Sequence, residues 1–133
     1  RRDDLEVCTV DIESIFVEIN KEYIDSSCNV IIGVIYRPPN REIINFQHEM
    51  SAILNKLKQS QKHCYLMGDF NINILRSDDH PSTSDFIDLM YSNSFVPLIN
   101  KPTRITQQSA TLIDNIYTNC IDKTELLQGI FFY

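Results

Sequence analysis

The sequence predicts an α/β protein in which a mixed sheet is covered by helices, and three observations support this. Several short segments alternate apolar and polar residues with a period of two, as half-buried strands do. Two longer segments repeat apolar residues every three or four positions, as amphipathic helices do. Both kinds of segment alternate through the middle of the 133-residue chain. This order is typical of a sheet with helices on its outer faces, and the length fits one domain.

The first half of the chain predicts a hairpin and a helix. Residues 13–19 alternate in the manner of a strand, and residues 28–36 are rich in Val and Ile. The polar segment between them predicts a long loop. Pro38 and Pro39 should end the second strand, because proline cannot donate to a strand ladder. Residues 42–58 have helical apolar spacing and one solvated face.

The second half predicts a strand, a helix and two more strands. Residues 63–67 form a short apolar strand that Gly68 closes, and the second helix spans residues 82–91, capped by Ser82 or Thr83. Residues 95–99 and 111–117 are the next strands, with a loop rich in Pro, Thr and Gln between them. Residues 126–133 are an apolar run like a strand entering a core. We therefore expect a fragment of a longer domain, and the alternative is a C-terminal strand that completes the sheet.

Composition and charge exclude several classes of protein. Twelve Lys and Arg against 18 Asp and Glu give a net charge of −6, which argues against a broad basic face that coats nucleic acid. A nucleic-acid enzyme stays possible, because a carboxylate metal site adds negative charge. The four cysteines form no CxxC pair, so a zinc or redox motif is not expected. No apolar run approaches the ~20 residues of a membrane span, and we expect an intracellular protein.

The sharpest chemical signal lies at the end of the third predicted strand. Here Asp69, Asn71 and Asn73 alternate with Phe70 and Ile72. A period of two predicts a carboxylate and two amides on one face, at the carboxyl edge of a strand. A carboxylate can hold a metal or orient a water, and an amide can donate to a phosphate oxygen without adding repulsive charge. The alternative, an Asx-rich turn that only ends the strand, stays open on spacing alone.

A second cluster follows the most hydrophobic strand. Tyr36 and Arg37 stand at its end, directly before the two prolines. A phenol and a guanidinium held by rigid neighbours could reach a phosphate. A solvated strand exit is the alternative interpretation.

A third cluster lies in the loop before the last predicted strand. Residues 101–111 offer hydroxyls and cations, and Asp114 follows between Ile113 and Ile116. A carboxylate buried there needs a partner, and nothing else in the sequence nominates one.

Taken together in this order, the clusters resemble the endonuclease/exonuclease/phosphatase superfamily. More narrowly, they resemble the apurinic-endonuclease-like domain of non-LTR (LINE-type) retrotransposons. The resemblance rests on residues 12–19, 34–39, Gly68-Asp69-Phe70-Asn71, residues 102–104 and residues 109–119. It implies a four-layer α/β/β/α sandwich, with two mixed sheets packed face to face and helices outside, truncated at both ends and forming a single partial domain over residues 1–133.

The resemblance also implies an activity, which is hydrolysis of a phosphodiester with Mg²⁺ or Mn²⁺. In the retrotransposon this nicks target DNA, in the nucleus, for a covalently linked reverse transcriptase domain. Asp69 would orient the attacking water and contribute to the metal site, and Asn71 would contact the scissile phosphate. Tyr36 would hold that phosphate, and Asp114 would support a catalytic histidine. The residues implied in substrate binding are Arg37, Thr103, Arg104 and Ser109.

The departures from the family pattern bear on activity. The metal-binding Glu of a Gln-Glu strand, expected before Leu5, is missing, and so are the early Asn that accompanies it and the closing Ser-Asp-His. Glu13 and Glu18 lie on a later strand and do not replace that Glu. We therefore expect the fragment to be impaired as it stands. Two alternatives remain, a non-catalytic binding module descended from the same fold and a phosphatase acting on inositol lipids or nucleotides.

Overall fold

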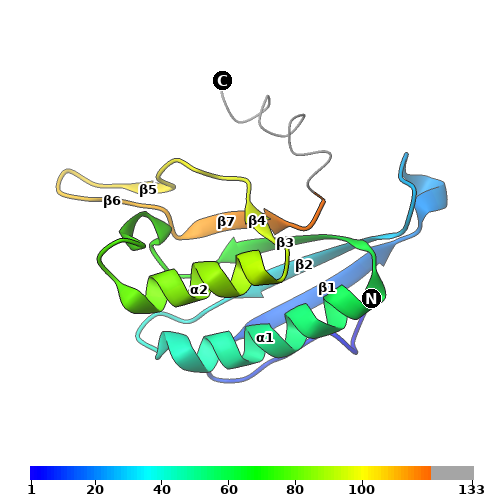
Figure 1. Cartoon of the computed structure of the whole chain (residues 1–133), viewed down its shortest axis with the longest axis horizontal. Helices are drawn as coiled ribbons and strands as arrows, with labels where there is room; N and C mark the ends of the chain where they lie inside the picture. Colours follow the sequence, from blue (N-terminus) through cyan, green and yellow to red (C-terminus); the bar gives the residue numbers. More distant parts are fainter. Residues whose placement is uncertain (121–133) are drawn as a thin grey trace.

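The computed structural model describes residues 1–120, which form a mixed five-stranded sheet with two helices on one face (Figure 1). Its strand order is β1-β2-β3-β7-β4. The first two strands form the predicted antiparallel hairpin, β3 runs parallel to β2, and β7 is antiparallel to both of its neighbours. The strands are β1 (Glu13–Ile19), β2 (Val30–Tyr36), β3 (His63–Asp69), β4 (Val96–Pro97) and β7 (Asp114–Thr118).

Helix α1 (Ile43–Ser60) is the connection that parallel strands require, since it links β2 to β3. It lies beside α2 (Pro81–Ser92) on the same face of the sheet (Figure 1). The apolar positions that predicted α1 point inward, and its buried residues are Phe46, Met50, Ile53, Leu54 and Leu57. The spacing therefore identified both the helix and its buried face.

The start of α2 differs from the prediction. The N-cap is His80, and Pro81 occupies the first helical position, where its fixed φ suits a helix and its missing N–H costs nothing. Thr83, a predicted cap, is instead buried in the first turn, with its hydroxyl 3.0 Å from Nδ1 of His80. Ser82 lies inside the helix. The prediction of a Ser82 or Thr83 cap was wrong because Pro81 sets the start of the helix earlier.

The segment between β4 and β7 contains a hairpin that the sequence pattern did not predict. Strands β5 (Arg104–Ile105) and β6 (Ala110–Thr111) pair as a separate two-stranded sheet, which projects at one end of the molecule (Figure 1). Both β5 residues are exposed, so burial imposes no alternation there. The two other short elements are η1 (Lys21–Tyr23) and η2 (Ile74–Arg76). The apolar run at residues 126–133 lies outside the described residues.

The core between the sheet and the helices contains a group of four aromatic rings. Phe70 contacts Phe46, Phe86 and Tyr117, with ring centroids 5.1–6.3 Å apart. These residues come from α1, α2, β7 and the loop after β3. Because Phe70 directly follows Asp69, the core fixes the path of the chain just beyond the end of β3.

The other face of the sheet is not covered by the helices. Ile15 and Val34 are each 47% exposed and Val17 is 42% exposed, although all three are large apolar residues within strands. We call the side of the sheet that carries these residues the open face. Among residues 1–120, no helix has the length and apolar character needed to cross a membrane.

Candidate active site

Three predicted site residues lie in one row across the sheet. Tyr36 on β2 is the register partner of Asp69 on β3. Asp69 is in turn the partner of Asp114 on β7. Register partners on neighbouring strands project on the same side, with Cβ atoms about 4.5–5.5 Å apart in an antiparallel pair. The structure therefore brings together a phenol and two carboxylates that are far apart in the sequence.

The row projects onto the open face. Along β3, Cys64 and Leu66 are buried against the helices, so the alternating position Asp69 points the other way. Asp69 and Asp114 are both half-buried, while Tyr36 is 40% exposed. Glu13 on β1 is the register partner of Tyr36 and extends the row. It lies two strands from Asp69, roughly 10 Å at the usual strand spacing.

Gly68 brings the end of β3 close to β2. Its φ is +152°, and a Cβ atom added there would lie 1.8 Å from the carbonyl oxygen of Ile35. No residue with a side chain fits this approach. The glycine that signalled the end of a strand in the sequence is therefore needed for the pairing that aligns Tyr36 with Asp69.

The loop after Asp69 does not continue the strand, so the prediction of one shared face for Asp69, Asn71 and Asn73 was wrong. Asn71 has φ +48°, in the left-handed region that Asn tolerates better than most residues. Its N–H donates to Oδ1 of Asp69 at 3.0 Å. Phe70 and Ile72 are buried, as the alternation predicted. The open alternative, an Asx turn, describes this local geometry better.

Asn73 stabilises the loop after β3 by accepting two hydrogen bonds from the backbone. Its Oδ1 accepts from the N–H of Leu75 at 3.3 Å, which caps η2, and from the N–H of Leu112 at 3.0 Å. This amide joins the loop after β3 to the segment before β7. It thereby holds Asp69 and Asp114 on adjacent strands without pointing into the row.

Arg37 is not in the open position that the sequence suggested. Its side chain is only 4% exposed, and it donates to two backbone carbonyls, those of Asn71 at 2.9 Å and of Arg41. Burial lowers the pKa of Arg37, against the opposing effect of the Asp11 and Glu42 carboxylates. In this arrangement the guanidinium faces the protein interior, because the loop after β3 folds over it.

The other predicted substrate-binding residues lie on or beside the β5–β6 hairpin. The Thr103 hydroxyl accepts from the N–H of Asp114 at 3.3 Å, so Thr103 touches the row. Arg104 is exposed on β5, and its register partner is Thr111. Ser109 lies at the hairpin turn, 2.9 Å from the Thr106 hydroxyl. Thr103 thus lies beside the row, whereas Arg104 and Ser109 lie farther from it on the exposed β5–β6 hairpin.

Asn115 holds β7 in place and was missed by the sequence analysis. It is 4% exposed; its Nδ2 donates to the carbonyl of Ile99 at 3.0 Å, and its Oδ1 accepts from the N–H of Ile99 at 3.2 Å. These two bonds hold the strand directly after Asp114. The available signal was an amide directly before the apolar pair Ile116 and Tyr117, since an amide needs a partner when buried.

The donor chemistry of the row suits a hard divalent cation. Asp69 and Asp114 offer carboxylate oxygens, and Tyr36 offers a phenol oxygen beside them. Mg²⁺ in proteins is usually held by one or two carboxylates, with water and phosphate oxygens completing its shell. Within residues 1–120, no group of three or more His, Cys, Asp or Glu side chains is arranged to hold a metal. A cation held here by one or two carboxylates would need water and substrate oxygens as its remaining ligands.

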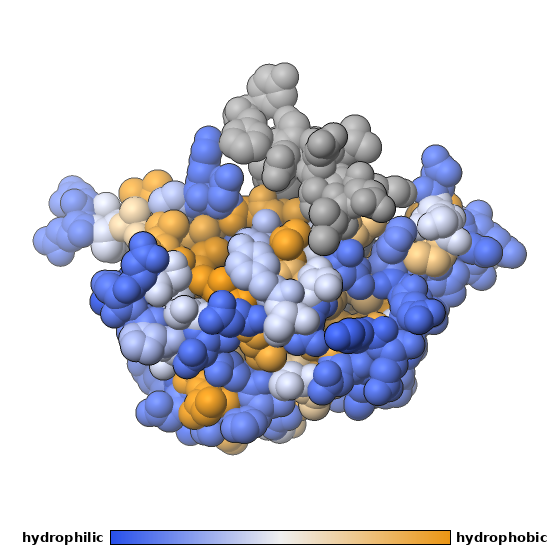
Figure 2. All heavy atoms as spheres, viewed as in Figure 1, coloured by the Kyte–Doolittle hydropathy of each residue, from blue (hydrophilic) through white to orange (hydrophobic). Residues whose placement is uncertain are grey.

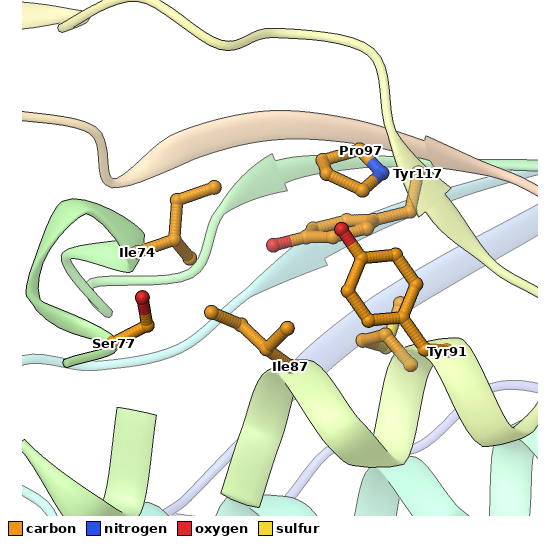
Figure 3. Close-up of a pocket in the computed structure, with 7 residues that line it drawn as sticks. Ile74, Ser77, Ile87, Tyr91, Pro97 and Tyr117 are labelled. Atoms are coloured by element: carbon orange, nitrogen blue, oxygen red, sulfur yellow. The ribbon is translucent and has the colours of Figure 1, made fainter. Parts of the chain in front are cut away.

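A pocket of about 290 Å³ lies on the opposite side of the sheet, between α2, η2 and β4. Tyr117 and Tyr91 point their hydroxyls into it, and Ile74, Ile87 and Pro97 line it (Figure 3). On the surface, apolar residues gather above α2 in the orientation of Figure 1 (Figure 2). Tyr117 lies three positions after Asp114 on β7, so the two side chains point to opposite faces of the sheet. The pocket, which Tyr117 lines from the core side, is therefore separate from the row.

No family profile and no curated protein matches the sequence, but solved structures match the fold. The endonuclease domain of TRAS1, a telomere-specific non-LTR retrotransposon, superposes with a TM-score of 0.61 at 12% identity, over 86% of this chain and 50% of that one. An endonuclease/exonuclease/phosphatase family protein from Leptotrichia buccalis gives 0.55 at 18% identity, over 80% and 42%. The Xenopus laevis APE2 catalytic domain gives 0.52 at 16% identity, over 86% and 46%.

This chain has the endonuclease/exonuclease/phosphatase fold. The predicted fold class is thereby confirmed, since the chain is mixed α/β and its structural neighbours are sandwiches of this fold. Residues 1–120 contribute one helical layer and one large sheet to that architecture (Figure 1). The chain spans about half the length of each neighbour, between 42% and 50%.

Proposed function

We propose that this chain carries part of the catalytic edge of a Mg²⁺-dependent DNA endonuclease of a non-LTR retrotransposon. The observation that carries the proposal is the pairing of Asp69 with Asp114 across β3 and β7, beside Tyr36. Two carboxylates directly opposite each other repel. A divalent cation held by Asp69 beside Asp114 would offset this repulsion.

In this proposal each residue has one task. Asp69 holds the cation and orients the attacking water. Asn71 already donates one N–H of its amide to the carbonyl of Arg37 at 2.7 Å, which leaves its second N–H for a phosphate oxygen. Tyr36 donates its phenol to the same phosphate, and Asp114 orients a catalytic histidine. A bound Mg²⁺ would stabilise the negative charge that develops on the phosphate and the leaving oxygen.

DNA is the proposed substrate, and Thr103, Arg104 and Ser109 are proposed to contact it. The β5–β6 hairpin supports this, because it is an exposed arm that starts beside Asp114 and presents Arg104. A linked reverse transcriptase domain and a nuclear site of action belong to the same proposal. The TRAS1 endonuclease domain among the structural neighbours is their support.

The experiment is nicking of supercoiled plasmid by the purified chain in Mg²⁺, with Mn²⁺-induced NMR line broadening as a second measurement. The matched variants are Asp69→Asn in the row and Asp88→Asn on the exposed face of α2. We expect Mn²⁺ to broaden the signals of Asp69 and Asp114 selectively, and only Asp69→Asn to abolish this. Nicking that Asp69→Asn leaves unchanged, or a folded chain with neither broadening nor nicking, would overturn the proposal.

A non-catalytic interaction module is the second candidate, and the open face favours it. Ile15 and Val34 are each 47% exposed, which suits a surface that another protein segment covers. In this case Ile15→Lys would abolish partner binding, whereas Asp69→Asn would leave it intact.

A further inference from the structure

Arg37 and Asn71 hold each other through two reciprocal hydrogen bonds. Nη1 of Arg37 donates to the carbonyl of Asn71 at 2.9 Å, and Nδ2 of Asn71 donates to the carbonyl of Arg37 at 2.7 Å. The two residues follow the ends of β2 and β3, which are paired through Tyr36 and Asp69. Each side chain therefore binds the backbone of the residue that follows the other strand, directly beyond the row.

The other contacts of Arg37 point to a positional role. The second guanidinium nitrogen, Nη2, donates to the carbonyl of Arg41. Among the described residues, Nε has no hydrogen-bond partner, although it is buried. Burying a guanidinium without a carboxylate in direct contact costs free energy. Stabilisation alone therefore does not account for an arginine at this position, whereas the geometry it imposes on the loop does.

A short path leads from the guanidinium to the carboxylate of Asp69. Arg37 holds the carbonyl of Asn71, whose backbone is in the left-handed region at φ +48°. In that conformation the N–H of Asn71 donates to Oδ1 of Asp69 at 3.0 Å. If the carbonyl of Asn71 were released, the φ and ψ angles of Asn71 would no longer be fixed, and the N–H on the other side of its Cα would no longer be held against Asp69.

We propose that Arg37 is a positioning residue, whose guanidinium locks the loop after β3 and so sets the orientation of the Asp69 carboxylate toward the row. Its effect on hydrolysis rests on the proposed function, whereas its effect on Asn71 does not. Lysine cannot replace it, because an ammonium lacks the planar fork that reaches two carbonyls at once. Losing a partner that orients a metal-binding group commonly costs about 10- to 100-fold in affinity or activity.

The test compares Arg37→Lys with Arg2→Lys in the full chain. Arg2 is a matched control, because it also uses both ends of its guanidinium, on Asp4 and Glu18, and lies at the other end of the sheet from the row. The first measurement is the ¹H–¹⁵N spectrum of the backbone and side-chain amides of Asn71. The second is the Mn²⁺ affinity at Asp69 from line broadening, and the third is the rate of plasmid nicking.

We expect Arg37→Lys to shift both Asn71 signals and to weaken Mn²⁺ binding about 10- to 100-fold. In nicking we expect kcat to fall with little change in KM. Arg2→Lys should change none of these, even where it lowers the melting temperature. Unmoved Asn71 signals in Arg37→Lys would overturn the inference, and so would a loss of Mn²⁺ affinity that Arg2→Lys shares.

The outcomes also separate this inference from the proposed function. The wild-type chain could neither bind Mn²⁺ at Asp69 nor nick DNA while Arg37→Lys still moves the Asn71 signals. In that case the proposed function is wrong, and the positioning of the loop after β3 by Arg37 is confirmed. Should Arg37→Lys not fold, Arg37→Gln replaces it, since a neutral amide removes the buried charge but lacks the fork that reaches the carbonyls of Asn71 and Arg41. The Arg37→Gln spectrum should then show the Asn71 and Asp69 signals displaced, and unchanged signals would overturn the inference.

Discussion

Asp69 and Asp114 are cross-strand partners on β3 and β7, and both carboxylates project onto the open face of the sheet. Such a pair repels at neutral pH and is destabilising compared with a neutral pair. The pairing is imposed from outside the row, by Asn73 and Asn115, which hold the loop after β3 and the start of β7. The fold thus keeps two like charges together, a cost that a bound cation would relieve.

Replacing one of these charges should stabilise the metal-free chain. We expect Asp114→Asn to raise the free energy of unfolding by about 0.2–1 kcal/mol without divalent metal, because the repulsion disappears. Addition of Mg²⁺ should stabilise the wild type more than the variant. Urea denaturation with and without Mg²⁺ checks both statements. Asp88→Asn, an exposed change on α2, is the control, and equal effects in both variants would contradict the repulsion.

A side chain at Gly68 should disrupt the end of β3. The added methyl of Gly68→Ala would lie 1.8 Å from the Ile35 carbonyl oxygen, at a φ of +152° that residues with a Cβ rarely adopt. We expect a loss of at least about 2 kcal/mol in the free energy of unfolding. Urea denaturation beside Glu13→Ala, at an exposed position of β1, gives the comparison. A loss no larger than that of Glu13→Ala would show that β2 moves aside at little cost.

The ionic cluster around Glu18 should make stability depend on pH. The Glu18 carboxylate accepts from Lys62 at 2.6 Å, Asn29 at 2.7 Å and Arg2 at 2.6 Å. The hydrogen bond from Lys62, then that from Asn29, then that from Arg2 lower the pKa of Glu18 from 4.5 to about 2, against burial, which raises it. Since the folded-state pKa is depressed, this stabilisation is complete above about pH 4.5 and is lost as the pH falls toward about 2.

The variant Glu18→Gln tests this cluster. It should be less stable than the wild type at pH 6, and the difference should shrink at pH 3. Urea denaturation at the two pH values measures it, with Glu22→Gln as a control at an exposed position. A difference that stays constant between the two pH values would exclude Glu18 as its source.

The four cysteines should differ in their reactivity. Cys8 is exposed, whereas Cys64 is buried. Burial raises the pKa of Cys64 to about 12, against the hydrogen bond from Asn119, which lowers it. At pH 8 Cys64 is therefore a protonated, inaccessible thiol. We expect iodoacetamide to modify Cys8 rapidly and Cys64 only after unfolding in urea, as followed by peptide mass spectrometry. Equal rates in the folded chain would contradict the burial.

The elements with a strong burial pattern could be predicted from the sequence, and the exposed ones could not. Strand β1 and helix α1 each bury one face, so apolar spacing located them within two residues. Strand β5 is fully exposed, and its pairing depends on contacts with β6 that leave no apolar signal. Helix α2 starts at Pro81, where backbone geometry overrides the side-chain capping preference of Ser82 and Thr83.

The candidate site could be predicted as a set of residues but not as an arrangement. Tyr36, Asp69 and Asp114 were nominated from three separate segments, and only strand register reveals that they form one row. Asn71 was assigned to the right loop with the wrong geometry, because a period of two assumes an extended backbone and φ is +48° there. Arg37 was expected in the open because a side chain's burial by a distant loop is not encoded in local spacing.

The position of β7 has a consequence for synthesis of the chain on the ribosome. Within residues 1–120 this strand is the last of the sheet in sequence, yet it lies inside the sheet between β3 and β4 (Figure 1). Until residues 114–118 leave the exit tunnel, the edge of β3 that carries Asp69 has no partner. The nascent protein must therefore keep that edge from pairing wrongly until β7 has been translated. Asp114 belongs to β7, so the row cannot form before this strand has been inserted.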